Sequence, residues 1–303
     1  MAGLKALIPL DGTKLSEHAF ELLPLLKTMG FDSVRLVSVW ESAWEETESG
    51  RKEQDFGEAT EKGRSYLEAY LDQQAAAVRA AGFEPEPVVR IGRAADEVVE
   101  ASKGVDLVLI ATHGRSGISR WWLGSVADKV VRDVECPVLL IGPNVHQDLA
   151  PGKITRILLP LDGSDQAEEA IPVATWIARL TNSEIEAVRC MSLTPVAYDP
   201  SMSIYSADLI NSLQEAVEEY LAGVQAKLGS KATTTMLVGG AGELLIEYLE
   251  EHPAGLVVMT SHGRSGVRRV ALGSVTDRLL HGPAPVLVVR AGGGLLAKAK
   301  SAS

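Results

Sequence analysis

The sequence predicts a mixed α/β protein built from two repeats of a doubly wound, five-stranded parallel sheet. Three observations lead to this prediction. An internal repeat covers nearly the whole chain, short apolar runs alternate with helical patterns in each half, and 303 residues suit two domains of about 150 residues each. Apolar strands separated by helices are typical of parallel sheets covered on both faces, because each parallel crossover needs a helix.

The internal repeat keeps both order and spacing. Three pairs of segments match: Ala6–Thr13 with Ile157–Ser164, Thr112–Gly117 with Ser261–Gly266, and Pro137–Ile141 with Pro285–Val289. In both copies nine residues separate a glycine from a Gly-Ser pair: Gly114 from Gly124-Ser125, and Gly263 from Gly273-Ser274. Chance does not produce this agreement, so one domain occurs twice. We place the domains at 1–142 and 154–292, with a linker over 143–153 that contains Pro and Gly, and a tail over 293–303.

Each half is predicted to contain five strands and four helices. In the first half we expect strands at Lys5–Leu10, Ser33–Trp40, Pro87–Ile91, Leu107–Ala111 and Val138–Ile141, and helices at Ser16–Met29, Gly57–Ala81, Ala95–Ser102 and Ser125–Val134. In the second half we expect strands at Arg156–Leu161, Glu184–Met191, Thr233–Val238, Leu256–Thr260 and Val286–Val289, and helices near Gln166–Leu180, Ser206–Leu228, Gly242–Glu251 and Ser274–His281. The polar, acidic segment Glu41–Phe56 is predicted to be a mobile loop near the first pocket, with plain solvation favoured over a role as a lid.

Composition narrows the classes of function. A net charge of −11 argues against a nucleic-acid-binding surface, which normally needs a basic patch. Only two cysteines occur, Cys136 and Cys190, so a disulfide scaffold is excluded and a reducing compartment is indicated. We see no signal peptide and no apolar run long enough to cross a bilayer. These features predict a cytoplasmic protein that binds neither membrane nor nucleic acid.

A carboxylate follows the first strand of each copy. In doubly wound sheets, ligands bind at the carboxyl ends of the strands, where the strand order reverses. Asp11 and Asp162 lie at such ends and can accept a hydrogen bond from an exocyclic amine or a sugar hydroxyl. Asp-Gly is also a common turn pair, so each aspartate can instead hold a turn or cap the next helix. The pattern leaves both interpretations open.

The Gly-Ser pair after the fourth strand opens the last helix of each copy. Glycine lets a backbone approach an oxyanion closely, and the free N–H groups of a helix start attract anions. The hydroxyls of Ser125 and Ser274 can add a bond to a phosphate. Each serine also resembles the start of a capping box, with an aspartate in the fourth position, Asp128 or Asp277. Capping and phosphate binding are compatible, because a helix terminus supplies several N–H donors.

The segment before each Gly-Ser pair also holds charged side chains. Arg115 and Arg264 either neutralise a phosphate or stay solvated. His113 and His262 have no triad or metal partner at recognisable spacing, so a structural role is favoured over a catalytic one.

These residues closely resemble the universal stress protein family in its tandem form, from Lys5 to Arg290. The resemblance rests on the Pro-x-Asp-Gly-Ser/Thr signature of the first strand, the Gly-x9-Gly-Ser loop and the closing Pro-Val-Leu-Val-type strand, each present twice. It implies a Rossmann-like fold of the adenine nucleotide alpha hydrolase-like type. Nucleotide-binding members carry Gly-x2-Gly-x9-Gly-Ser/Thr. Here Ala111 and Thr260 replace the first glycine, and threonine is the bulkier and β-branched replacement.

The resemblance also implies a ligand, ATP or another adenine nucleotide, with Mg²⁺ bridging phosphate oxygens rather than held directly by the protein. By this likeness the rim aspartates face adenine or ribose, the end of strand two meets the base, and the glycine–serine loop holds the phosphates. The implied site residues are Pro9, Leu10, Asp11, Val39, Gly92, Ala111, Gly114, Arg115, Gly117, Gly124, Ser125 and Val126 in the first copy, and Pro160, Leu161, Asp162, Cys190, Gly239, Thr260, Gly263, Arg264, Gly266, Gly273, Ser274 and Val275 in the second.

Three functions follow as hypotheses. The first is an ATP-binding stress-response regulator that acts through nucleotide-dependent conformation or an unidentified protein partner, with slow hydrolysis or none. The second is a scaffold that binds no nucleotide, and the third is a slow nucleotide hydrolase or phosphotransferase. No P-loop or dinucleotide fingerprint follows a first strand, and no general base is evident beside the loop, so no catalytic residue is assigned.

The family resemblance predicts one more interaction. Family members pair through the last strand of each domain. We therefore expect Val138–Ile141 and Val286–Val289 to meet edge to edge in an internal pseudo-dimer, and two chains can associate further as a homodimer.

Overall fold

The structure, a computed structural model, describes residues 3–41, 44–47, 50–53, 57–112, 124–146, 149, 152–192, 207–260, 273–290 and 295. The chain divides into two compact units, whose main parts are Met1–Pro143 and Gly152–Gly292. Each unit is an α/β domain with a parallel sheet, so the predicted fold class is confirmed.

The first unit contains five parallel strands. These are β1 (Leu4–Pro9), β2 (Phe31–Trp40), β5 (Glu84–Ile91), β6 (Leu107–Ala111) and β7 (Val138–Ile141). They lie in the order β5-β2-β1-β6-β7. The chain leaves β1 in one direction, through β2 to β5, and then returns to β6 on the other side of β1. The strand order therefore reverses between β1 and β6, which is where such sheets form ligand crevices.

The second unit repeats this topology. Its strands are β8 (Arg156–Leu161), β9 (Glu184–Met191), β10 (Thr233–Val238), β11 (Leu256–Thr260) and β12 (Val286–Val289). They lie in the order β10-β9-β8-β11-β12, so the reversal falls between β8 and β11. All residues of β6 and β11 are buried, as expected for apolar central strands of a covered sheet.

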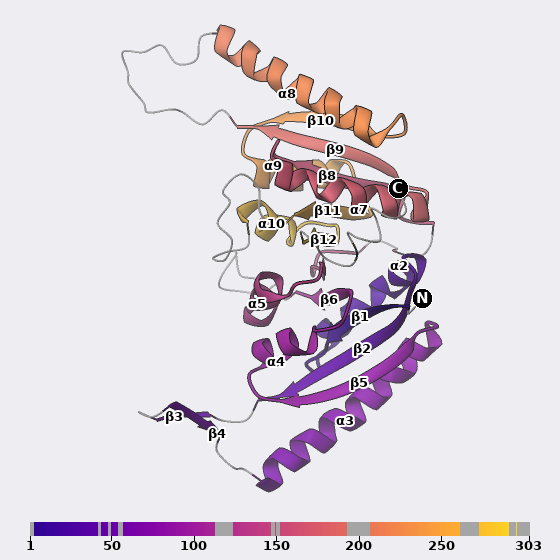
Figure 1. The fold of residues 1–303 in the computed structure, drawn as a ribbon, viewed down its shortest axis with the longest axis vertical. Helices are drawn as coiled ribbons and strands as arrows, with labels where there is room; N and C mark the ends of the chain where they lie inside the picture. Colours follow the sequence, from indigo (N-terminus) through magenta and orange to yellow (C-terminus); the bar gives the residue numbers. More distant parts are fainter. Residues whose placement is uncertain are drawn as a thin grey trace. The chain divides into compact units, whose positions relative to one another are not determined.

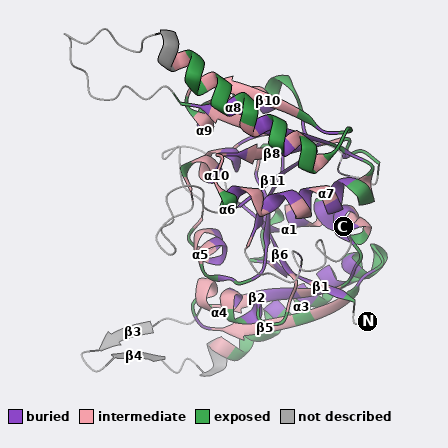
Figure 2. Ribbon diagram, turned by 45° about the horizontal axis from the view of Figure 1, so that its top comes forward, coloured by how far each residue is buried: buried purple, intermediate pink, exposed green. Residues whose placement is uncertain are grey.

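Helices connect the strands in both units. In the first unit they are α1 (Lys14–Glu17), the 3-10 turn η1 (His18–Leu22), α2 (Leu23–Thr28), α3 (Gly57–Ala80), α4 (Ala94–Ala101) and α5 (Ser125–Asp133). In the second they are α6 (Asp165–Glu168), α7 (Ala170–Thr181), α8 (Ala207–Leu228), α9 (Ala241–Glu251) and α10 (Ser274–Leu279). The long helix α3 runs beside β5 and β2, and α8 runs beside β9 and β10 (Figure 1). Figure 2 shows buried residues in the sheets and exposed residues on the outer sides of the helices.

Two predictions about the first unit are wrong. The helix expected over Ser16–Met29 is broken into α1, η1 and α2, and Pro24 stands in the first turn of α2, where its missing N–H is tolerated. Within the segment expected to be a loop, β3 (Trp44–Thr47) and β4 (Gly50–Glu53) form an antiparallel pair.

The outer strand of the first unit begins earlier than predicted. β5 starts at Glu84, before the predicted start at Pro87, and so includes Pro85 as well as Pro87. Gly92 N donates to Trp40 O at 3.1 Å, so by alternation the backbone N–H groups of Arg90, Val88 and Glu86 point toward β2. The backbone nitrogens of the two prolines point away from it. Proline lacks the N–H that a second neighbour would need, so an edge position tolerates it.

Charged side chains tie the strands together in each unit, with opposite arrangements. In the first unit Glu86 of β5 accepts from Lys5 Nζ of β1 at 2.8 Å and from Arg35 Nε of β2 at 3.0 Å. Burial raises the pKa of the Glu86 carboxyl, but the hydrogen bonds and positive charges of Lys5 and Arg35 together outweigh burial, and the pKa lies below its usual value.

In the second unit the acid lies on the second strand. Glu186 of β9, which is 5% exposed, accepts from Arg156 Nη1 of β8 at 2.8 Å and from Thr235 Oγ1 of β10 at 2.7 Å. Arg35 and Glu186 occupy equivalent positions of the repeat, so the second strand carries opposite charges in the two units.

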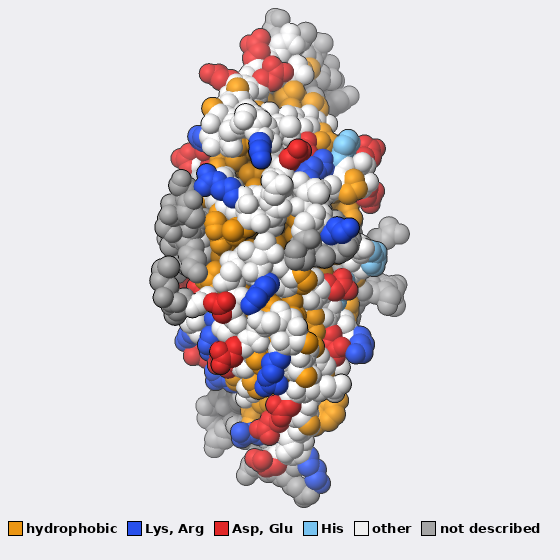
Figure 3. All heavy atoms as spheres, turned by 90° about the vertical axis from the view of Figure 1, so that its right-hand side faces the viewer, with side chains coloured by type: hydrophobic (Ala, Val, Ile, Leu, Met, Phe, Trp, Pro, Cys, Tyr) orange, Lys and Arg blue, Asp and Glu red, His pale blue; other side chains and the backbone are white. Residues whose placement is uncertain are grey.

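The described surface mixes charges of both signs. On the face shown in Figure 3, Lys and Arg side chains are interspersed with Asp and Glu. Among the described residues no helix has the length and apolar character that crossing a bilayer requires.

Candidate functional site

The turn after the first strand fixes the rim aspartate in both units. Asp11 Oδ1 accepts from Thr13 N at 3.0 Å and from Thr13 Oγ1 at 2.6 Å, and Asp162 Oδ1 accepts from Ser164 N at 2.9 Å and Oγ at 2.6 Å. Gly12 and Gly163 between them have φ values of 82° and 84°, which favour glycine. Each aspartate therefore stabilises the turn, and the same hydrogen bonds fix its carboxylate at the end of the strand.

The last helix of each unit begins at a glycine. Gly124 and Gly273 are the N-caps of α5 and α10, and neither helix has a side-chain capping bond. Ser125 and Ser274 are the first helical residues, so the capping-box prediction for them is wrong. Because glycine offers no side-chain acceptor, the N-cap residue itself leaves the first N–H groups of these helices without a side-chain bond.

A cavity of about 220 Å³ lies at the strand-order reversal of the first unit. It is formed by the ends of β1, β2 and β6 and the starts of α4 and α5. Eight predicted site residues line it: Pro9, Leu10, Asp11, Val39, Ala111, Gly124, Ser125 and Val126. The sequence had not pointed to its other walls, among them Ser16, Ala94 and Val98.

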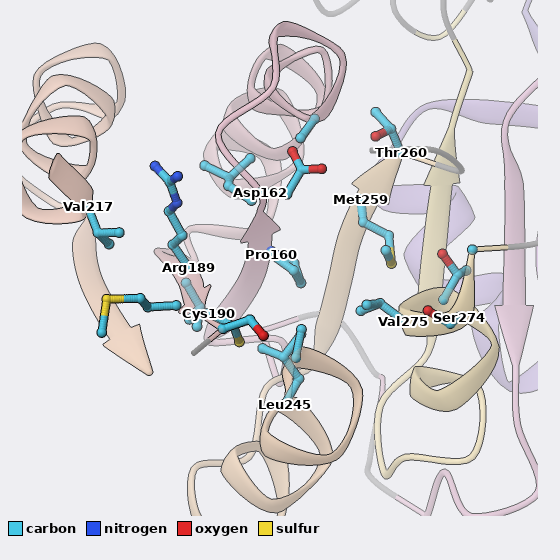
Figure 4. Close-up of a pocket in the computed structure, with 18 of the residues that line it drawn as sticks. Pro160, Asp162, Arg189, Cys190, Val217, Leu245, Met259, Thr260, Ser274 and Val275 are labelled. Atoms are coloured by element: carbon cyan, nitrogen blue, oxygen red, sulfur yellow. The ribbon is translucent and has the colours of Figure 1, made fainter. Parts of the chain in front are cut away.

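A larger cavity of about 580 Å³ occupies the matching position of the second unit. Eight predicted residues line it as well: Pro160, Leu161, Asp162, Cys190, Thr260, Gly273, Ser274 and Val275. Figure 4 shows Asp162 lying between Arg189 on one side and Thr260 on the other, with Ser274 and Val275 beyond. The cavity also extends to α8 and α9, through residues such as Val217 and Leu245.

The remaining predicted residues do not join these linings. Gly114, Arg115, Gly117, Gly263, Arg264 and Gly266 lie outside the described residues. Gly92 and Gly239 do not line the cavities; their φ values of 148° and 143° turn the chain after β5 and β10. The cavities are lined instead by the first residues of the helices that follow, Ala94 and Ala241.

Arg189 is the main residue that the sequence reasoning missed. It precedes Cys190 on β9, and its guanidinium carbon lies 4.5 Å from the centre of the Tyr220 ring on α8. The guanidinium also lies against Gly163, so closely that a Cβ there would be 2.8 Å from it. The equivalent residue of the first unit is Ser38, which is buried and donates to Leu10 O at 2.8 Å. Comparing the copies position by position could have revealed this difference.

The chemistry of the lining side chains suits binding more than reaction. Burial raises the pKa of the Cys190 thiol to about 11, so the nucleophilic thiolate is scarce at neutral pH. Among the residues that the structure describes, no group of three or more His, Cys, Asp or Glu side chains is placed to hold a metal ion.

Fold and site together define a tandem α/β protein with one rim cavity per unit, each between an Asp-Gly turn and a Gly-Ser helix start. A family model described as the universal stress protein family matches residues 4–142 and 153–290. The chain therefore belongs to the universal stress protein family, in a form with two family domains, and the resemblance seen in the sequence is confirmed.

Known relatives agree with this assignment. A universal stress protein of Mycobacterium tuberculosis is 30% identical over 198 residues, which are 64% of each chain, so the match spans less than two thirds of that relative. One of Methanocaldococcus jannaschii is 34% identical over 140 residues, 45% of this chain and 81% of the relative. The crystal structure of a universal stress protein from Archaeoglobus fulgidus shares the fold, with a TM-score of 0.70 and 22% identity over 95% of this chain and 98% of that one.

Proposed function

We propose that this stress-response protein binds an adenine nucleotide, ATP foremost, and works by binding rather than by turnover. The observation that supports this most is the doubled rim cavity, where a fixed carboxylate and a helix start whose N-cap is glycine line the same space in each unit. Helix starts of this kind attract phosphate, and a rim carboxylate can accept from a sugar hydroxyl or an exocyclic amine.

The residues present fit such a ligand. The second cavity, at about 580 Å³, falls in the size range of small-molecule sites, about 300–1,000 Å³. Asp162, Thr260 and Ser274 would hold the polar sugar and phosphates, and Cys190, Pro160 and Met259 would contact the base. Mg²⁺, when bound with the nucleotide, would neutralise phosphate charge through the phosphate oxygens.

The same geometry supports binding without turnover. One oxygen of Asp11 and one of Asp162 already accept two hydrogen bonds each, which keeps these carboxylates in place as acceptors. The described lining offers no histidine that could act as a general base. We therefore expect ATP hydrolysis to be slow or absent.

Titration calorimetry with MgATP tests the proposal. Asp11→Asn and Asp162→Asn keep the oxygen that holds the turn but replace the second oxygen by an amide, so each should weaken one site about tenfold. Asp72→Asn, on the exposed side of α3, makes the same charge change away from both cavities and should bind as wild type does. The absence of heat at high micromolar MgATP, with folded protein, would refute the proposal.

A scaffold without nucleotide is the second candidate. It is favoured for the first unit, where the cavity of about 220 Å³ falls below the usual size range of small-molecule sites. Absorbance near 260 nm and chromatography of the purified protein distinguish the two candidates, because co-purifying nucleotide would exclude the scaffold.

We also propose the location, the domain boundaries and the partners of the protein. We place the protein in the cytoplasm, with domains at 1–142 and 154–292 joined by the linker 143–153 and followed by the tail 293–303. We also retain pairing between the last strands, β7 and β12, a homodimer of two chains and an unidentified regulatory protein as proposed partners.

A further inference from the structure

The two units differ where the second strand ends beside the long helix. In the first unit the indole of Trp40 lies against α3 at Gly63. A Cβ added to Gly63 would be 2.4 Å from the ring carbons, so any side chain at this position would collide with the indole. The indole therefore fills the space between β2 and α3.

In the second unit no described side chain fills the same space. The equivalent residues are Met191 and Leu213, and both line the cavity, together with Ala216 and Val217 of α8. Among the described residues, none of α3 lines the first cavity. The cavity volumes follow this difference, at about 580 Å³ in the second unit and about 220 Å³ in the first.

The second cavity consequently has two chemically distinct ends. Asp162, Thr260 and Ser274 form a polar end beside β8 and β11. The end between β9, α8 and α9 is mainly apolar, with Arg189 and Ser192 as its polar members. Figure 4 shows Val217 at the α8 side and Thr260 and Ser274 at the opposite side, with Cys190 and Pro160 between. Arg189, which lies over Tyr220 and against Gly163, connects α8 to the turn after β8 and forms one wall.

We infer that the second unit takes an adenine nucleotide whose base carries an apolar substituent, and that the first unit does not. This inference rests on the proposed function. Sugar and phosphates at the polar end, with the base against Cys190 and Pro160, leave the apolar end facing the outer edge of the base. A substituent on the exocyclic amine enters there and contacts Met191, Leu213 and Val217. In the first unit Trp40 occupies the equivalent space.

Cys190 provides a readout of this cavity alone. Its alkylation by iodoacetamide at pH 9 is followed by peptide mass spectrometry, and Cys136, which is buried, serves as an internal reference. MgATP and N6-benzyl-ATP with Mg²⁺ are compared by the concentration that halves the alkylation rate. We expect the benzyl compound to protect at a concentration at least about tenfold lower, because apolar groups in fitted pockets discriminate at this level.

Variants test whether the open space causes the preference. The double variant Met191→Trp with Leu213→Gly copies the first unit, and it should bind both compounds equally well. Met191→Leu conserves volume and polarity and should keep the preference. If circular dichroism shows that the double variant does not fold, Ala216→Leu narrows the same space with a single change.

Each outcome decides the matter. Equal protection of wild-type Cys190 by both compounds would overturn the inference and leave the proposed function intact. Heat on MgATP titration without protection of Cys190 by either compound would assign binding to the first unit and also overturn it. If the folded protein neither releases heat nor protects Cys190, the proposed function and the inference fail together.

Discussion

The contact between Trp40 and Gly63 predicts that Gly63→Ala changes the free energy of unfolding in a direction that depends on whether residue 40 is tryptophan. Glycine inside a helix is less favourable than alanine by about 1 kcal/mol, so helix propensity by itself would make Gly63→Ala stabilise α3. The structure opposes this gain, because the new Cβ would lie 2.4 Å from the indole carbons. Displacing packed groups costs about 1–3 kcal/mol. We therefore expect a net loss of up to about 2 kcal/mol in the free energy of unfolding.

The expected sign reverses once the indole is removed. In the Trp40→Met background, which copies the second unit, Gly63→Ala should stabilise by up to about 1 kcal/mol. Gly223→Ala in α8 is the matched control: a Cβ there meets no atom within 4 Å, so the helical gain should appear undiminished.

Urea unfolding of the four proteins of this cycle, followed by circular dichroism, measures the coupling. Neighbours in contact give interaction energies of about 0.5–3 kcal/mol. If Gly63→Ala has the same effect in both backgrounds within about 0.5 kcal/mol, the indole does not restrict this position and the explanation for the smaller first cavity is wrong.

Two further predictions concern stability and strand pairing. Because the folded-state pKa of Glu86 is lowered, its ionised form stabilises the fold above its unfolded pKa of about 4.3, and this contribution disappears as pH falls through the folded value. Glu86→Gln should therefore lower the free energy of unfolding in urea at pH 7, by less than about 1 kcal/mol because these side chains are partly exposed, and have little effect near pH 3. An equal loss at both pH values would contradict this. In β7 and β12 every second residue forms backbone hydrogen bonds to β6 or β11, as shown by the bonds from Thr112 N to Ile141 O and from Val257 N to Pro285 O. The backbone amides of the residues between them point away from β6 and β11. These outward amides belong to Val138, Leu140, Val286 and Val288. If β7 and β12 pair, hydrogen exchange should show that these amides are protected. Rapid exchange would refute the pairing.

Local chemistry made much of the fold and the rim predictable. The Asp-Gly-Thr/Ser turns depend on residues within two positions of Asp11 and Asp162, and the strands depend on apolar runs that alternate with helices. The doubled motif then located the crevice, because the topology of a doubly wound sheet fixes where its order reverses.

The features that escaped prediction depend on distant contacts or on backbone angles. Arg189 became visible only through its packing on Tyr220 of α8. The size of the first cavity depends on Trp40 meeting Gly63 on another element. Gly124 rather than Ser125 caps α5 because its extended backbone, with φ −54° and ψ 147°, ends the loop one residue earlier than the capping-box pattern indicates.

The ion pairs Arg35–Glu86 and Arg156–Glu186 have opposite polarity, so each sheet would be destabilised by the equivalent strand of the other repeat. Were β2 to occupy the place of β9, Arg35 would meet Arg156 and Thr235 without any acid, and β9 beside β1 would bring Glu186 against Glu86. Glu186 is buried, and a buried charge that loses its partner costs about 3–5 kcal/mol in measured cases, whereas the partly exposed pairs of Glu86 contribute less. Chains made of similar repeats are prone to exchange matching segments while they fold. The opposite polarity of the two arrangements would therefore disfavour an exchange of matching strands between the two repeats.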